Sequence, residues 1–197
     1  MPNDPATDLK DLRDLQRGEE EALDRLVARW QRPLMAFAYR YVQNSADAQD
    51  LVAETFVRLY QRRLGLRPDT NLPAWLFTAL SNLCHNLHRW RRRHPTVALG
   101  PPSGGADAPA DLKSAEEGPD GALERDESVA ALSSAVAALP HDLRVTVLLH
   151  HYEHLSYRQI APVIGCSERG VETRLYRARQ LLRTKLAHFI GEAVPRR

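Results

Sequence analysis

Residues 155–183 read LSYRQIAPVIGCSERGVETRLYRARQLLR, and this stretch decides the fold of the C-terminal half of the chain. Ser156 and Gln159 form a capping box, in which the two side chains reciprocally satisfy free backbone donors at a helix start. Gly165 supplies the left-handed residue that ends this helix, and Ser167 is the N-cap of the next one. Two helices joined by so few residues must cross at a steep angle, which predicts a helix-turn-helix.

The second helix of this motif, expected over 168–189, has two different faces. The positions on one side are apolar and predict the buried face: Val171, Leu175, Ala178, Leu182, Leu186 and Phe189. The other side carries guanidinium and neutral hydrogen-bonding groups: Arg169, Thr173, Tyr176, Arg177, Gln180 and Arg183. Such groups can reach base edges and phosphates in the major groove, so we favour DNA binding over an ordinary solvated surface. Pro162 lies inside the first helix, expected over 156–164, and predicts a kink there.

A proline- and glycine-rich segment, residues 96–123, precedes this motif and predicts a flexible acidic linker. On either side of it, apolar residues recur at steps of three and four, which predicts an all-α chain. We expect two small helical domains over 1–95 and 124–197, the second a helix-turn-helix of the winged-helix-like DNA-binding class. Pro33 should kink or divide its helix. The remaining helices are expected over 8–16, 19–42, 45–63, 72–93, 124–138 and 141–153.

The formal charge is distributed unevenly along the chain. It is +3 over 1–97, −6 over 98–140 and +5 over 141–197, which together give the net charge of +2. Two basic ends around an acidic middle predict a polyanionic partner. The sequence has no apolar run of membrane-spanning length, and Cys84 and Cys166 fit neither a disulfide framework nor a zinc spacing. We therefore expect a cytoplasmic protein with no membrane contact and no cofactor.

The helix expected over 45–63 carries an acidic cluster beside its apolar stripe. Asp47 and Asp50 lie near the helix start, where negative charge is favourable at the positive end of the helix dipole. Glu54 lies further inside and is not explained in this way, which predicts a docking surface for a basic partner. The apolar stripe consists of Leu51, Val52, Thr55, Phe56, Leu59 and Tyr60.

The helix expected over 72–93 ends in the sequence RWRRR, residues 89–93. Four guanidiniums exceed what the helix dipole requires, so they predict a phosphate-binding surface, with Asn82 and His85 available to read bases. The apolar side, expected to be buried, consists of Leu76, Ala79, Leu80, Leu83, Leu87 and Trp90. The row on the opposite side consists of Thr78, Asn82, His85, Arg89 and Arg92.

These stretches together resemble the sigma-70 family of bacterial RNA polymerase sigma factors. Residues 46–60, ADAQDLVAETFVRLY, are similar to the polymerase-binding helix of sigma region two. Residues 73–77, PAWLF, followed by Asn82 and the arginine run, resemble the helix of that region that reads the minus-ten promoter element. Residues 139–179 resemble region four. Because only these two regions are present, the chain is similar to the extracytoplasmic-function (ECF) group.

The resemblance implies a protein that gives RNA polymerase its promoter choice and is not an enzyme. The implied partners are core polymerase, through its clamp helices and flap, promoter DNA in double-stranded and melted form, and, as a further candidate, an anti-sigma factor. Loop 61–71 would capture a base flipped from the melted strand, although it contains no aromatic residue. The residues implied to face polymerase are Asp47, Asp50 and Glu54. Those implied at the minus-ten strand are Asn82, His85, Asn86, Arg89 and Arg92. Those implied in the major groove of the minus-thirty-five element are Arg169, Glu172, Thr173, Arg174 and Arg177.

Two other functional classes compete with this interpretation. A sigma mimic would bind only an anti-sigma factor, but it would have no use for the arginines of 89–93. A metalloenzyme could use His150, His151 and His154, or the acidic cluster of the helix 45–63, as ligands. The histidines lack the glutamate of an H-E-x-x-H arrangement and an evident further ligand, so we expect no metal and no catalytic site.

Overall fold

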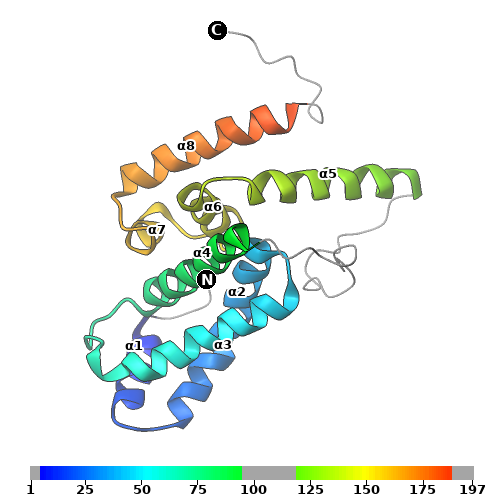
Figure 1. Ribbon diagram of the computed structural model, residues 1–197. Coiled ribbons are helices and arrows are strands. Elements are labelled where there is room, and N and C mark those ends of the chain that lie inside the picture. The colour runs from blue at the N-terminus through cyan, green and yellow to red at the C-terminus, as the bar shows by residue number, and fades with distance from the viewer. Residues whose placement is uncertain (1–4, 95–118, 188–197) are drawn as a thin grey trace.

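A computed structural model of the chain describes the backbone of residues 5–94 and 119–187, and the side chains of 6–94 and 128–187. The described residues form helices and turns without any strand, as the all-α prediction requires. The helices of the first domain are α1 (Pro5–Gln16), α2 (Glu21–Val42), α3 (Ser45–Arg62), the short 3₁₀ helix η1 (Arg63–Gly65) and α4 (Leu72–Arg93). Helix α2 packs against α1, α3 and α4 (Figure 1).

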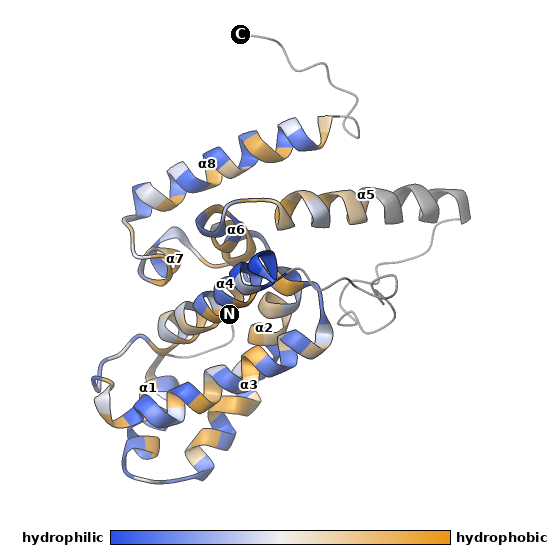
Figure 2. Ribbon diagram, viewed as in Figure 1, coloured by the Kyte–Doolittle hydropathy of each residue, from blue (hydrophilic) through white to orange (hydrophobic). Residues whose placement is uncertain are grey.

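The first domain is built around aromatic side chains that the amphipathic helices bring together. Trp30 and Phe37 of α2 both meet Phe77 of α4 edge to face, with ring centroids 6.3 and 5.6 Å apart. All three side chains are almost completely buried. The apolar sides of α2, α3 and α4 are turned toward one another (Figure 2), so burial of these stripes accounts for the arrangement of the helices.

An ionic ladder fastens α1 to α2. Asp8 and Asp11, one helical turn apart and nearly buried, both accept hydrogen bonds from Arg29, at 2.7 and 2.6 Å. Arg25 donates to Asp11 at 2.7 Å and to Asp14 at 3.2 Å. Burial alone would raise the pKa of Asp11, but the hydrogen bonds from Arg25 and Arg29 outweigh it and hold that pKa below its ordinary value. The ladder therefore depends on ionised carboxylates.

The second domain consists of α5 (Pro119–Ala137), α6 (His141–Val147), the π-helical turn η3 (Leu148–Tyr152), α7 (Tyr157–Val163) and α8 (Glu168–Lys185). The predicted capping box of Ser156 and Gln159 is present at the start of α7. Gly165 has a φ of +62°, and the Ser167 hydroxyl accepts a hydrogen bond from the Gly170 amide at 3.2 Å. A Cβ at Gly170 would lie 3.0 Å from the Cys166 sulfur, so glycine permits this tight turn.

The two domains pack against each other along a seam formed by α2 and α4 on one side and α6, η3 and α7 on the other (Figure 1). The Thr78 hydroxyl donates a hydrogen bond to the Val163 carbonyl at 3.1 Å. The Tyr41 hydroxyl lies 2.9 Å from Nδ1 of His141, and Arg144 donates to the Tyr41 carbonyl. Buried apolar residues of both domains consequently form one continuous core.

Three expectations about the helices need correction. Helix α2 continues through Pro33, so of the two expected effects, a kink or a division, the division does not occur. Helix α5 begins at Pro119, inside the segment predicted as linker, whereas the rest of that segment, 96–118, lies outside the described residues. Trp90 is 49% exposed, so its predicted burial was wrong. It lies in the last turn of α4, beyond the helices that cover the rest of that face, and it stacks on His94 with ring centroids 5.1 Å apart.

Candidate nucleic-acid interface

Helix α8 lies at the outer edge of the second domain (Figure 1), and one of its faces is polar and exposed. Val171, Leu175 and Ala178 are buried as predicted, whereas Leu182 is only partly buried and Phe189 lies outside the described residues. This packing fixes the rotation of the helix about its axis and therefore decides which side chains face solvent. The residues of the predicted face that are exposed are Arg169, Thr173, Tyr176, Arg177, Gln180 and Arg183, together with Glu172.

The predicted minus-thirty-five residues differ in how freely they can move. Arg177 is exposed and has no recorded partner among the described residues. Arg174 is half-buried, donates to the Gly170 carbonyl at 3.3 Å and lies 3.9 Å from the Asp142 carboxylate. Thr173 donates its hydroxyl back to the Arg169 carbonyl at 2.9 Å. Arg177 is therefore the better placed of the two central arginines to reach a base edge.

Helix α4 presents a second polar row. Its register is set at the start by Asn71, whose side chain accepts a hydrogen bond from the Ala74 amide at 3.1 Å, so the helix begins at the predicted residue. Four of the five predicted minus-ten residues are exposed: Asn82, Asn86, Arg89 and Arg92. The fifth, His85, is half-buried and lies against His141, with ring centroids 4.2 Å apart. His85 thus belongs to the seam in this arrangement.

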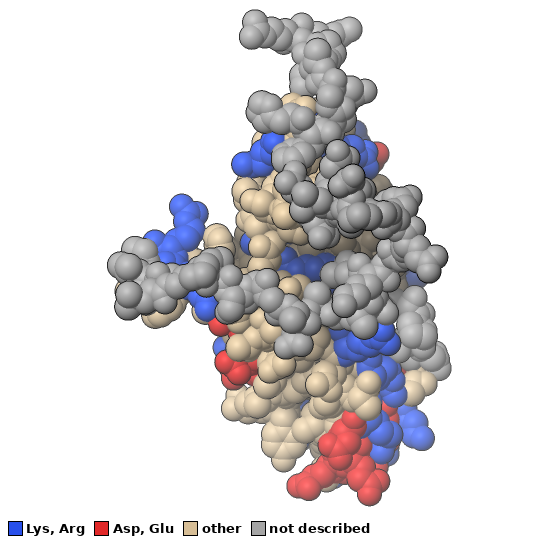
Figure 3. All heavy atoms as spheres, turned by 90° about the vertical axis from the view of Figure 1, so that its right-hand side faces the viewer, with Lys and Arg blue, Asp and Glu red and all other residues tan. Residues whose placement is uncertain are grey.

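The acidic cluster of α3 is not uniformly available. Asp47 is ion-paired with Arg91 of α4 at 2.6 Å, and its side chain is 19% exposed. Glu54 pairs with Arg58 one turn further along the same helix, at 2.7 Å. Asp50 is exposed and has no recorded partner among the described residues. Figure 3 shows acidic and basic side chains side by side at the lower edge of the first domain.

An exposed apolar patch lies beside the acidic cluster, and it was not predicted from the sequence. Val57 and Tyr60 of α3 and Leu64 of η1 are 48%, 38% and 73% exposed. The Arg63 guanidinium lies 3.9 Å from the centroid of the Tyr60 ring. Tyr60 belongs to the predicted apolar stripe, and its exposure shows that α3 uses only part of that stripe for the core. Val57, Tyr60 and Leu64 follow one another at steps of three and four residues, so the helical period, continued past residue 63, could have grouped them on one side.

The first two residues of the predicted loop 61–71 belong to α3, the 3₁₀ turn η1 follows, and the loop ends at Asn71, the N-cap of α4. The Arg67 guanidinium makes two hydrogen bonds with the Asp69 carboxylate, at 3.0 and 2.9 Å. The Gln16 side chain ties the start of the loop to α1, because its amide donates to the carbonyls of Arg63 and Leu66 at 2.8 Å each. The first half of the loop is therefore held against α1, whereas residues 67–69 face solvent.

The histidines considered as metal ligands, His150, His151 and His154, do not converge on a common point. His150 lies 3.1 Å from the Leu155 carbonyl, and its ring contacts Tyr157 and His151. His154 has a φ of +53° in the turn before α7. Within residues 6–94 and 128–187, no three His, Cys, Asp or Glu side chains are close enough together to hold a metal ion. None of the described helices is both long and apolar enough to cross a bilayer.

Both helical domains match known protein families. Residues 26–94 match the family description "Sigma-70 region 2", and residues 130–182 match "Sigma-70, region 4". The chain is 31% identical over 181 residues to the RNA polymerase sigma-H factor of Pseudomonas aeruginosa, covering 91% of this chain and 93% of the relative. It is 29% identical over 186 residues to the ECF RNA polymerase sigma-E factor of Escherichia coli, covering 89% and 92%.

Two solved structures share the fold. CnrH, in complex with the cytosolic domain of CnrY, has a TM-score of 0.68 at 24% identity, covering 92% of this chain and 98% of that one. The Bartonella quintana sigma factor RpoE, in complex with the anti-sigma factor NepR, has a TM-score of 0.61 at 25% identity, covering 83% and 96%. With region two over α2–α4, region four over the helix-turn-helix and a relative 31% identical along nearly its whole length, the chain belongs to the ECF group of the sigma-70 family.

Proposed function

We propose that this sigma factor reads the two elements of its promoters with the exposed polar rows of α4 and α8. As a member of the family, the chain binds core RNA polymerase and promoter DNA and directs promoter recognition and transcription initiation. The observation that carries the proposal is the presence of two such rows in one chain, one in each domain. Because they belong to one molecule held by polymerase, binding of the first raises the effective concentration of the second.

The α4 row is proposed to follow the melted minus-ten strand. Asn82 and Asn86 lie one turn apart and offer amide groups that can pair with the edges of unstacked bases. Arg89 and Arg92 continue the row toward the end of the helix, where their guanidiniums can hold phosphates. The exposed outer part of loop 61–71 is proposed to receive a flipped base. His85 joins this row only if α6 moves away from α4.

The α8 row is proposed to enter the major groove of the minus-thirty-five element. Arg169, Glu172 and Thr173 lie in the first half of the helix, which is the part that contacts base edges in helix-turn-helix proteins. Arg177 follows one turn later with a free guanidinium that suits the bidentate contact with guanine. Arg174, already bonded within the helix-turn-helix, is proposed to position the backbone rather than to read bases.

The polymerase surface is proposed to combine the acidic cluster with the neighbouring apolar patch. Asp50 and Glu54 supply exposed negative charge for basic groups on the clamp helices, and Tyr60 and Leu64 supply apolar area. The second domain is proposed to meet the flap. Since polymerase and promoters are cytoplasmic in bacteria, we propose that the chain acts there, without a cofactor and without catalysing a reaction itself. The Bartonella quintana sigma factor RpoE, which was solved with the anti-sigma factor NepR, supports an anti-sigma factor as a further proposed partner.

The decisive experiment is run-off transcription with purified chain and core polymerase on a genomic promoter library. The expected result is RNA that starts at a defined set of promoters, whose upstream sequences then give both recognised elements. A sigma mimic, the alternative function, would bind an anti-sigma factor yet yield no start-site preference. Failure to bind core enzyme at all would refute the proposal together with the assignment of Asp50 and Glu54 to the polymerase surface.

A further inference from the structure

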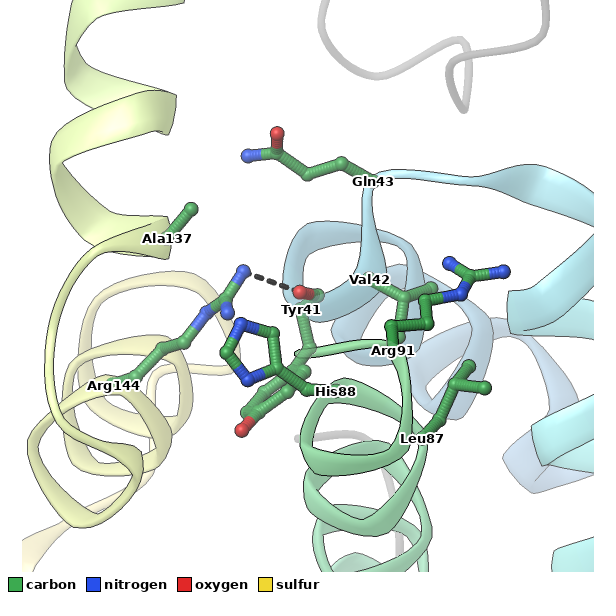
Figure 4. A pocket seen from close by; sticks show the side chains of 8 residues that line it. All are labelled: Tyr41, Val42, Gln43, Leu87, His88, Arg91, Ala137 and Arg144. Atoms are coloured by element: carbon green, nitrogen blue, oxygen red, sulfur yellow. Dashed lines mark hydrogen bonds between the residues drawn. The ribbon is translucent and has the colours of Figure 1, made fainter. Parts of the chain in front are cut away.

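A small cavity opens at the seam between the two domains, beneath the C-terminal end of α2 (Figure 4). Its volume is about 140 Å³. A single water molecule needs roughly 10 to 15 Å³ on this measure, so the cavity has room for an ion of several non-hydrogen atoms. Both domains contribute to its wall, which consists of Tyr41, Val42, Gln43, Leu87, His88, Arg91, Ala137 and Arg144.

Arg144 brings an uncompensated positive charge to this cavity. Its residue surface is only 3% exposed, and no Asp or Glu of the described residues lies within ion-pair distance of it. Its guanidinium donates to the Tyr41 carbonyl and lies 4.2 Å from the centroid of the Tyr41 ring, while Nε has no hydrogen-bond partner. Burial lowers the pKa of Arg144. A buried charge without a counter-charge is costly, and a negative ion in the cavity would remove that cost.

The other groups around the cavity add to its preference for an anion. Figure 4 shows the His88 ring beside the Arg144 guanidinium, with Arg91 turned away from both. Arg91 already carries Asp47 as its partner. Burial and the nearby charge of Arg144 lower the pKa of His88. An anion between His88 and Arg144 would oppose the effect of the Arg144 charge and favour a protonated His88. The Gln43 amide donates to the Ser133 carbonyl of α5 at 3.2 Å and closes the rim.

We infer that this cavity binds a small oxyanion of the size and charge of inorganic phosphate, held between the Arg144 guanidinium and the His88 imidazole. Arg144 would supply its free Nε hydrogen and a full positive charge, and His88 a second donor. Because Arg144 comes from α6 and His88 from α4, the bound ion joins the two domains. Occupancy therefore stabilises the packed arrangement of the domains relative to any arrangement in which they separate.

The test measures binding of inorganic phosphate to the full-length chain by isothermal titration calorimetry, with chloride adjusted to keep ionic strength constant. The expected result is saturable binding that weakens at least tenfold in Arg144→Gln and at least threefold in His88→Gln. The matched control is Arg158→Gln, which removes an exposed arginine of α7 away from the cavity and should leave the affinity unchanged. If circular dichroism shows that Arg144→Gln does not fold, the test relies on His88→Gln and Arg144→Lys. Both variants should bind inorganic phosphate more weakly than the parent chain.

A second arm separates free phosphate from the phosphate groups of a polynucleotide. A short single-stranded DNA without a terminal phosphate is titrated into the chain in the presence and absence of saturating inorganic phosphate. Independent binding of the two ligands identifies the cavity as a site for the free ion, whereas competition that disappears in Arg144→Gln identifies a backbone phosphate as the occupant. The inference is overturned if no saturable phosphate binding is found, or if the affinity falls equally in Arg158→Gln.

Discussion

Replacement of Arg177 by alanine tests the role of α8 most directly. Arg177 is exposed and has no recorded partner within the described residues, so its removal leaves the core of the helix-turn-helix intact. A bidentate contact between arginine and guanine contributes about 1 to 3 kcal/mol of discrimination. We therefore expect Arg177→Ala to lower transcription from promoters that depend on the minus-thirty-five element by roughly 5- to 150-fold. The assay is run-off transcription at limiting sigma factor, on templates with intact and scrambled minus-thirty-five elements.

Arg179→Ala is the matched control for this experiment. Arg179 is also exposed, but it lies two residues further along α8 and hence about 200° away around the helix axis. The control should retain nearly full transcription activity on both templates. On the scrambled template, Arg177→Ala should give the same amount of transcript as the parent chain. Equal losses in the two variants, or a loss in Arg177→Ala that persists on the scrambled template, would refute the assignment of this face to base reading.

Three further variants test other parts of the structure. The double variant Asp50→Arg and Glu54→Arg should weaken association with core polymerase at least tenfold, measured by fluorescence anisotropy. The chain should stay folded, with only a small decrease in melting temperature from the lost helix-dipole and Arg58 interactions, because both side chains are exposed. Arg29→Met should lower the free energy of unfolding by about 3 kcal/mol in urea titrations, since it removes the cation that pairs with two buried carboxylates, those of Asp8 and Asp11. Burial raises the pKa of Glu153 to about 7, so the folded chain holds this proton more tightly than the unfolded chain and stability should fall as pH rises from about 4.5 to 7. Glu153→Gln should remove that decrease, which is worth roughly 1 to 3 kcal/mol, in thermal melts at several pH values.

Each of these predictions has its own control. Glu20→Arg with Glu21→Arg reverses the same charge at the start of α2, and an equal loss of polymerase binding there would show a general charge effect. Arg13→Met removes an exposed arginine of α1 and should change stability little, so a comparable loss would exclude the ladder as the cause. If Glu153→Gln kept the pH dependence of the parent chain, another group would have to account for it.

Local signals in the sequence predicted most helix ends. Ser167 caps α8 where the sequence predicts it, and α4 begins at the predicted residue, Leu72. Such ends can be predicted because an N-cap depends on a hydrogen bond between neighbours in the chain. The same signals predicted the helix-turn-helix, and the periodicity placed Val171 and Leu175 in the core. The proposed base-reading residues stay predictions, although the exposure of Asn82 and Arg177 is compatible with them.

Long-range contacts could not be predicted in this way. Periodicity identifies an apolar side but not the point at which the neighbouring helices stop covering it, and this is why Trp90 was wrongly expected to be buried. Arg144 and Tyr41 are far apart in sequence, and neither residue type signals a contact between domains. The ionic ladder between α1 and α2 has a signal in the sequence, because acidic residues recur at every third position from Asp8 to Asp14. Only the fold, however, shows that these residues face α2.

The ion pair between Asp47 and Arg91 joins the helix proposed to meet polymerase to the helix proposed to meet DNA. A basic group on polymerase that took over the Asp47 carboxylate would release the Arg91 guanidinium for a phosphate. Thermodynamic linkage then requires the reverse effect of equal size, so that DNA drawing on Arg91 would leave Asp47 more attractive to polymerase. One surface charge pair would in this way make the holoenzyme a tighter DNA binder than the isolated subunit, and a double-mutant cycle across the two residues would measure that coupling.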